Sequence, residues 1–431
     1  MKANKNSIIW MCNSCGNEFG AWSGKCSYCG EWNTIKEVKV VGGKHKNSTT
    51  QNAIEVLRLS EIETDNHRRI STGVEEMNRV LGGGIVPGSV ILLGGEPGIG
   101  KSTLLLQLCQ NICNVLYVSG EESLHQIKSR ADRIGVKESG CRLVASGDLL
   151  QIKVECETSR PALLIIDSIQ TVYLDNVESS TGSVSQVKEC GIFLQRLAKQ
   201  LNIPVLIIGH VTKEGDIAGP RLLEHIVDVV LYLEGDRFND ARILRGVKNR
   251  FGATNEVGIF SLDERGMTEI KNPSELFLSE KTNLAGSVVT AMIEGTRPIL
   301  IEVQALVTPT NFGYPKRTSS GFDLNRLNLL AAVITKKTNI NLSNCDIYLN
   351  IVGGIKVIEP AVDLAVCVAI ISSQKNIPAK ENICIFGEVG LSGEVRRVVR
   401  QKEREKEAKN LGYTLPKVIK NVSEIKELLV S

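Results

Sequence analysis

Eight consecutive residues, GEPGIGKS at 95–102, have the composition and spacing of a loop that holds phosphate groups. Glycines let backbone N–H groups point inward around an anion, and a helix that starts there adds partial positive charge. Lys101 would reach the β- and γ-phosphates of ATP, and Ser102 would bind Mg²⁺. An apolar strand precedes the loop and a helical run follows it, so we predict a nucleotide site. Its predicted contacts are Gly95, Glu96, Pro97, Gly98, Ile99, Gly100, Lys101, Ser102 and Thr103.

Carboxylates follow two apolar runs behind this loop. The run LLIID ends in Asp167, where a protein with such a loop places the acid that supports Mg²⁺. A second strand, at 115–118, is followed by Glu121 and Glu122. We predict that one of them orients and deprotonates the attacking water, while the other serves the dipole of the next helix.

Four cysteines near the N-terminus have the spacing of metal ligands. Cys12 and Cys15 form one pair, and Cys26 and Cys29 form a second pair after ten residues. Two such turns facing each other suit tetrahedral Zn²⁺ and leave no open coordination position, so the predicted metal is structural. The segment is too short for a hydrophobic core, and metal binding would supply its folding energy. The tryptophans are expected to pack around the metal, or else to form an exposed stacking or docking surface: Trp10, Trp22 and Trp32.

Net charge, the distribution of cysteines and the lengths of apolar stretches limit the class of protein. The chain has 431 residues and a net charge of +3, which is too small to argue for nucleic-acid binding by itself. The eight remaining cysteines lie scattered in or beside apolar runs, which is typical of a reducing cytoplasm. No secretory signal and no stretch long enough for a membrane helix is evident, so a cytoplasmic protein without membrane contact is expected.

The chain divides into four predicted parts: a zinc-binding module at 1–40, a linker at 41–69, an ATPase domain at 70–272 and a second α/β domain at 273–431. In the ATPase domain, short β-branched runs alternate with helical patterns, which predicts a mainly parallel sheet covered by helices. The expected strands are 89–93, 115–118, 163–166, 205–208 and 227–233, with helices at 102–113 and 186–201 and a hairpin of 242–247 and 256–261.

Four further segments resemble the RadA (Sms) family of bacterial DNA-repair proteins. They are SGEES at 119–123, GSVSQVKE at 182–189, GHVTKEG at 209–215 and KNRFG at 248–252. With the four-cysteine module, the resemblance covers nearly the whole chain in the same order. It implies an α/β fold with a RecA-type P-loop core, a homo-hexameric ring and ATP hydrolysis that depends on DNA. It also implies branch migration on single-stranded and branched DNA, alongside the RecA recombinase.

The resemblance, which extends to replicative helicases of the DnaB type, also implies roles for single residues. Glu121 matches the catalytic base, and His210 follows a strand from which such proteins sense the γ-phosphate, although a buried core histidine is the alternative. Lys248 and Arg250, expected at a hairpin turn, resemble cations that reach the neighbouring subunit's γ-phosphate. The competing interpretation is that both bind DNA phosphates.

The DNA contacts implied by the resemblance lie in two loops and the C-terminal region. The loops at 171–185 and 211–221 resemble the DNA-facing loops of such rings. Predicted phosphate contacts are Lys213 and Arg221 in the second loop and Lys316 and Arg317 further on, with ordinary solvated charge as the alternative.

The region from about residue 276 resembles the proteolytic domain of Lon, which uses a Ser–Lys dyad. Ala361, in IEPAVD, occupies the place of the nucleophilic serine, while Lys402 falls near the dyad lysine. A lysine without its serine performs no covalent catalysis, so no peptidase activity is expected.

These motifs bear on four candidate functions. The leading hypothesis is a DNA-dependent ATPase that translocates on single-stranded DNA. An ATP-dependent protease is argued against by Ala361, and a strand-exchange filament by the bulky C-terminal domain, which favours a closed ring. A scaffold that binds DNA under the control of ATP, without translocation, remains the alternative.

Overall fold

The computed structural model describes residues 7–12, 17–40, 69–136, 140–210, 220–235, 241–278, 283–310 and 313–430. Cys15 and Lys213 lie outside these residues. The chain forms two compact units, the first comprising 1–233, 247–252 and 264–266, and the second 234–246, 253–263 and 267–431. The division therefore runs through the last strands of the expected ATPase domain rather than at residue 272 alone.

The N-terminal module is a small antiparallel sheet of order β2-β1-β3. Its strands are β1 (Ser7–Cys12), β2 (Glu18–Phe19) and β3 (Ile35–Val40). Its buried apolar cluster contains only Cys12, Cys26 and Ile35, with Trp10 and Phe19 packed against it. Such a cluster buries little apolar area, so the described part of the module needs another source of folding energy.

The expected α/β core is confirmed as a nine-stranded sheet of order β12-β11-β10-β9-β4-β8-β7-β5-β6. The strands from β9 to β6 are parallel, and β10 pairs with β11 in an antiparallel hairpin. The parallel strands are β4 (Val90–Gly95), β5 (Val115–Ser119), β6 (Cys141–Val144), β7 (Leu163–Asp167), β8 (Val205–His210) and β9 (Val229–Gly235). The remaining three are β10 (Ala241–Asn249), β11 (Val257–Asp263) and β12 (Gly266–Glu269).

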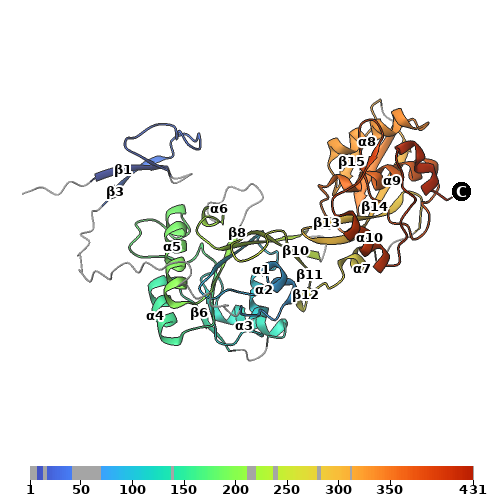
Figure 1. Cartoon of the computed structure of the whole chain (residues 1–431). Helices are drawn as coiled ribbons and strands as arrows, with labels where there is room; N and C mark the ends of the chain where they lie inside the picture. The colour runs from blue at the N-terminus through green and yellow to red at the C-terminus, as the bar shows by residue number, and fades with distance from the viewer. Residues whose placement is uncertain are drawn as a thin grey trace, which may run out of the picture. The chain divides into compact units, whose positions relative to one another are not determined.

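Helices cover both faces of the parallel strands (Figure 1). Alternate strand residues such as Val90 and Leu92 join α4 and α5 in one buried cluster, while Ile91 and Leu93 between them are also buried and face the other side. The helices are α1 (Glu75–Leu81), α2 (Lys101–Leu108), α3 (Leu124–Arg133), α4 (Leu149–Ser159), α5 (Val184–Leu201) and α6 (Pro220–Leu223).

Two details differ from the sequence-based expectation. The edge strand β6 was not predicted, because its four residues are only half-buried and give a weak apolar signal. Lys248 was placed in the hairpin turn, but β10 continues through it to Asn249. Only Arg250 and the residues after it lie in the bend that follows the strand.

The C-terminal unit has a second sheet of order β13-β14-β16-β15, in which only β15 and β16 pair in parallel. The strands are β13 (Ser287–Glu294), β14 (Arg297–Pro309), β15 (Arg317–Ser320) and β16 (Cys345–Ile351), with a small ribbon of β17 (Glu388–Val389) and β18 (Val395–Arg396). Its helices are α7 (Pro273–Leu278), α8 (Leu324–Lys337), α9 (Asp363–Lys375) and α10 (Gln401–Asn410), with short 3₁₀ turns at Pro360–Val362 and Val422–Leu428.

Charged side chains fix the interior of this unit. Arg404, on α10, is almost fully buried, donates to the backbone oxygen of Ala291 at 2.5 Å and forms a two-bond pair with Glu359. Asp363 at the start of α9 is fully buried, and its carboxylate accepts hydrogen bonds from the Arg326 guanidinium and from the backbone N–H of Val389. Burial raises the pKa of Asp363, and the contact with Arg326 opposes that rise.

No helix within the described parts of the chain is both long enough and apolar enough to cross a bilayer.

Candidate nucleotide site and metal centre

The predicted phosphate loop connects the end of β4 to the start of α2. Gly95, Gly98 and Gly100 have φ angles of 152°, 79° and 111°, which residues with a side chain rarely adopt. A Cβ atom on Gly95 would also lie 2.6 Å from the backbone oxygen of Leu233. The glycine pattern in the sequence is therefore a requirement of this backbone path.

Lys101 lies inside the loop at the first turn of α2. Its ammonium donates to the backbone oxygens of Gly95 at 2.8 Å and Glu96 at 2.9 Å. Burial lowers the pKa of Lys101 to about 8, although the nearby carboxylates of Asp167 and Glu121 act in the opposite direction. Phosphate oxygens carry full negative charge, so they are stronger partners for this ammonium than the two carbonyls.

Asp167 ends β7, and a tyrosine from the adjacent strand β5 holds its carboxylate. The Tyr117 hydroxyl donates to Asp167 Oδ2 at 2.5 Å, and both side chains are buried. Burial and the charge of Asp167 raise the pKa of Tyr117 well above its usual value, so this hydroxyl remains a donor. Tyr117 could not be identified as a site residue from the sequence, where its only signal is its place in an apolar strand.

Glu121 lies just beyond β5, and two polar side chains surround one of its oxygens. Ser168 Oγ donates to Glu121 Oε1 at 2.6 Å, and His210 Nε2 lies 3.3 Å from the same atom. Within the described residues neither ring nitrogen of His210 has a hydrogen bond of good geometry, so the 3.3 Å approach is a loose contact. A half-exposed carboxylate positioned in this way suits a general base acting on water.

The neighbouring acid Glu122 has a different environment. It forms an ion pair with Arg130 on α3, and its backbone N–H donates to Ser119 Oγ at 3.1 Å. This carboxylate already has a cationic partner in the described structure, whereas the charge of Glu121 acts on Lys101. The arrangement favours Glu121 over Glu122 as the base.

The structure joins the KNRFG segment to the strand that leads into the phosphate loop. Lys248 Nζ donates to the backbone oxygens of Glu224 at 2.6 Å and Val227 at 2.8 Å. Arg250 approaches Asp228 at 3.5 Å, and the other oxygen of Asp228 accepts the backbone N–H of Val90 at 3.0 Å. Burial, then the charge of Arg250, lowers the pKa of Lys248.

The described residues that were predicted to contact DNA differ in exposure and in their contacts within the protein. The backbone of Arg221 belongs to α6. Lys316 is exposed, but the Arg317 guanidinium donates to the backbone oxygens of Leu342, at 2.9 Å, and of Cys345. Burial lowers the pKa of Arg317. The contacts of Arg317 give it a structural role in this unit, while Lys316 is open to a ligand.

The first loop predicted to face DNA is organised by a buried glutamine. Gln186 on α5 donates to the backbone oxygens of Leu174, Val177 and Ser179 and accepts the N–H of Leu174 at 3.2 Å. The predicted loop at 171–185 overlaps the start of α5 at Val184, and this single side chain fixes its middle against that helix.

The N-terminal cysteines fit a tetrahedral metal. The sulfur atoms of Cys12, Cys26 and Cys29 lie within 4.8 Å of one another, and those of Cys12 and Cys29 are 3.7 Å apart. A Zn–S bond of about 2.3 Å places the sulfurs of a tetrahedron roughly 3.8 Å apart, so the spacing matches. Of the two alternatives for the tryptophans, Trp10 packs against the buried cluster, while Trp22 and Trp32 are 59% and 67% exposed and fit an exposed surface.

Comparison with known families gives two matches. Residues 57–216 match the description "AAA domain", and residues 10–37 match "Rubredoxin metal binding domain". The RadB recombinase structure is similar to 47% of this chain and all of that chain, with 24% identity and a TM-score of 0.38.

Together, the phosphate loop, the α/β sheet and the cysteine ribbon define a RecA-type P-loop ATPase core with an N-terminal metal-binding module. The chain is 49% identical to DNA repair protein RadA of Bacillus subtilis over 95% of its own length and 92% of that protein. It is 48% identical to DNA repair protein RadA of Listeria monocytogenes over 96% of its length and 92% of that protein. The chain belongs to the RadA family of DNA-repair proteins.

The cysteine module yields a first prediction, namely one Zn²⁺ per chain in freshly purified reduced protein. All three tryptophans of the chain lie between residues 10 and 32, so intrinsic tryptophan fluorescence reports on this module alone. Cys26→Ser should lose the zinc and shift that fluorescence while ADP affinity by calorimetry stays unchanged. Cys113→Ser, at an exposed cysteine, is the matched control. Elemental analysis that finds iron, or no metal, contradicts the assignment.

The lowered pKa of Lys101 yields a second prediction. Below pH ~8 the free site already holds a cationic lysine, so the affinity for a non-hydrolysable ATP analogue should not depend on this group. Above that pH the lysine is neutral in the free protein and must take up a proton when phosphates bind. The association constant should then fall by about tenfold per pH unit. Calorimetry in two buffers of different ionisation enthalpy measures the proton uptake. Lys101→Arg keeps a permanent charge, so this variant should show no proton uptake on binding. Equal proton uptake by the variant and the wild type would exclude Lys101 as its source.

Proposed function

We propose that this protein is a DNA-dependent ATPase that translocates on single-stranded DNA as a homo-hexameric ring and promotes branch migration of recombination intermediates together with RecA. One observation supports the proposal: Glu121, whose carboxylate accepts a hydrogen bond from Ser168, acts electrostatically on Lys101 of the phosphate loop, in a chain nearly half identical to DNA-repair proteins. ATP turnover and DNA repair are thereby linked in one molecule.

Each site residue has a defined task in this proposal. Lys101 leaves the loop carbonyls to bind the β- and γ-phosphates, and its charge stabilises the transferring phosphoryl group. Ser168 orients Glu121, which accepts a proton from the attacking water. Ser102 and Asp167 would hold Mg²⁺, which supplies neutralisation of phosphate charge when bound. Tyr117 keeps one oxygen of Asp167 occupied and so limits the rotation of the carboxylate.

His210 is the residue proposed to sense the γ-phosphate. Its ring lies beside Glu121 at the end of β8, with ring nitrogens that lack well-formed hydrogen bonds among the described residues. An imidazole in this position can bond a phosphate oxygen or transmit its loss to the segment that follows β8. The same environment argues against a core histidine, whose nitrogens are normally satisfied.

We also propose that a cation of the KNRFG segment completes the neighbouring subunit's site. Phosphoryl transfer spreads charge over equatorial oxygens, and a cation supplied by another subunit stabilises it. Arg250 is the better placed of the two, because its side chain is 52% exposed and its guanidinium makes a 3.5 Å ion pair with Asp228. Lys248 would first have to release two carbonyl partners.

The absence of peptidase activity is part of the proposal. Ala361 is buried in the short 3₁₀ turn before α9 and has no nucleophilic atom, while Lys402 is exposed on α10. The expected role of the C-terminal unit is to assist ring assembly and DNA contact, through exposed cations such as Lys316.

The decisive measurement for this function is phosphate release with and without a single-stranded oligonucleotide. We expect a several-fold stimulation by DNA in the wild-type protein and a loss of ~10² or more in Lys101→Ala. Lys153→Ala, at a half-exposed helix ion pair, should behave like the wild type because such pairs contribute ~0.5 kcal/mol. DNA binding without any stimulation of hydrolysis would favour the ATP-regulated scaffold.

Subunit mixing tests the cation supplied in trans. Arg250→Ala and Lys101→Ala subunits should each be inactive alone, and mixtures should regain activity at interfaces that combine an intact loop with an intact Arg250. Lys248→Ala, analysed in parallel, separates the two cations of the segment. If mixing never restores activity and Arg250→Ala hydrolyses ATP normally without DNA, the segment contacts DNA instead.

A further inference from the structure

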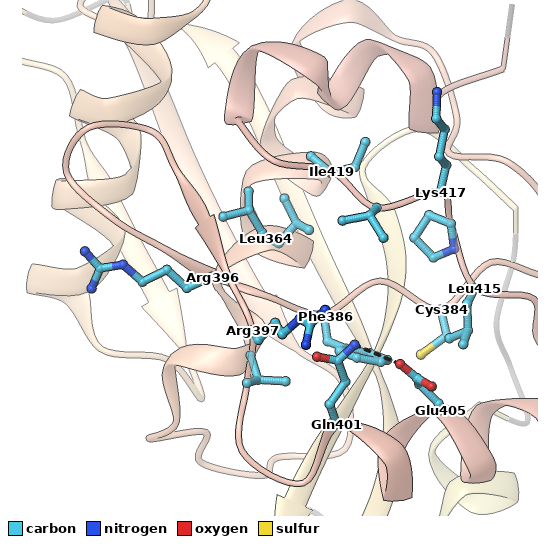
Figure 2. A pocket seen from close by; sticks show the side chains of 14 residues that line it. Leu364, Cys384, Phe386, Arg396, Arg397, Gln401, Glu405, Leu415, Lys417 and Ile419 are labelled. Carbon is cyan, nitrogen blue, oxygen red and sulfur yellow. Dashed lines mark hydrogen bonds between the residues drawn. The ribbon is translucent and has the colours of Figure 1, made fainter.

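The C-terminal unit contains a cavity of about 180 Å³ that none of the residues discussed above explains. Its apolar walls come from separate parts of the unit: Leu364 on α9, Phe386 before β17, and Leu415 and Ile419 from the segment after α10. Figure 2 shows these side chains around the opening together with Arg397, Gln401 and Lys417. The cavity accommodates one bulky apolar group.

The rim of this cavity carries uncompensated positive charge. Arg397 and Lys417 line it, and neither has an ion pair or side-chain hydrogen bond among the described residues. Arg396, also at the rim, is paired with Glu394 at 2.6 Å. The one carboxylate in the lining, Glu405, accepts a hydrogen bond from Gln401 at 2.8 Å. An occupant with acidic groups next to an apolar one would complement this surface.

One wall of the cavity is an extended backbone segment at 415–419 without a partner. The backbone oxygens of the two flanking residues have partners: the N–H of Cys384 donates to the oxygen of Thr414 at 3.0 Å, and the N–H of Val395 donates to that of Lys420 at 2.8 Å. Between them, the backbone groups of residues 415–419 form no hydrogen bond with any described residue. Pro416 has no N–H, so the segment offers N–H groups at Leu415, Lys417, Val418 and Ile419 and C=O groups at all five residues. Such groups are a template on which an extended peptide adds as a strand.

We propose that this groove binds an extended acidic peptide of a partner protein, with a bulky apolar side chain in the cavity and carboxylates against Arg397 and Lys417. Main-chain bonds to 415–419 would supply affinity, and the cavity would supply specificity. A nucleic acid fits less well, because its backbone cannot extend the amide row.

The test uses the full chain and a short fluorescein-labelled peptide of Asp and Glu residues ending in Leu-Phe, measured by fluorescence anisotropy. We expect binding that weakens about tenfold or more in the Arg397→Glu, Lys417→Glu double variant, since two exposed ion pairs become repulsive. Lys380→Glu, which reverses an exposed lysine of the same unit, should bind as the wild type does. A peptide with Ser-Ser in place of Leu-Phe should lose binding in all three proteins.

Three outcomes would overturn the proposal. One is equal binding by the wild type and the double variant while both retain the same melting temperature. A second is equal binding of a peptide in which Lys replaces Asp and Glu. The third is displacement of the peptide by a single-stranded oligonucleotide that binds the same groove more tightly, which would assign the surface to nucleic acid. ATP hydrolysis without DNA should be the same in all variants, so the result is independent of the proposed function.

Discussion

The parallel pairing of β4 with β8, β8 with β7 and β7 with β5 is the constraint on which the nucleotide site depends. In parallel strands all carboxyl ends meet at one edge of the sheet, so loops far apart in sequence become neighbours. Lys101 follows β4, Glu121 follows β5, Asp167 ends β7 and His210 ends β8. The register pairs Ser119 with Asp167 and Gly95 with His210, which brings one cation, two acids and an imidazole to the same edge.

Burial at this edge then sets the chemistry. Lys101 has little access to water, and its pKa falls to about 8 because two nearby carboxylates only partly offset desolvation. The same desolvation keeps the Tyr117 phenol protonated beside Asp167. A site with a buried cation and fixed carboxylates needs little rearrangement when charge shifts during phosphoryl transfer. The carboxylate of Asp228 links the KNRFG segment to the same strand, because one of its oxygens accepts the backbone N–H of Val90, the first residue of β4, and the other pairs with Arg250.

In the C-terminal unit, charged side chains are buried in the core and are compensated by partners of opposite charge. Helix α9 is apolar on nearly every side and lies within the core, so its charged first residue, Asp363, is buried with it. Arg326 compensates that charge, and Glu359 does the same for Arg404. Removing one partner of such a pair is far more costly than replacing both, because a lone buried charge remains. These pairs hold the segments around Ala361 in place although no nucleophile is present there.

The sequence by itself determined the features that depend on short fixed spacings. GEPGIGKS, the paired cysteines, the apolar strand ending in Asp167 and the antiparallel hairpin are all local patterns, and local backbone requirements such as the positive φ of Gly98 preserve them. Only the tertiary structure decided which groups meet across strands. Tyr117 and Asp167 are fifty residues apart, Lys248 finds its carbonyl partners on another segment, and separate segments of the C-terminal unit line its cavity. The ion pair of Glu122 with Arg130 has the same origin, since it depends on how α3 packs. Such contacts leave no periodic signal in the chain, because they arise from packing between elements rather than from the conformation of any one of them.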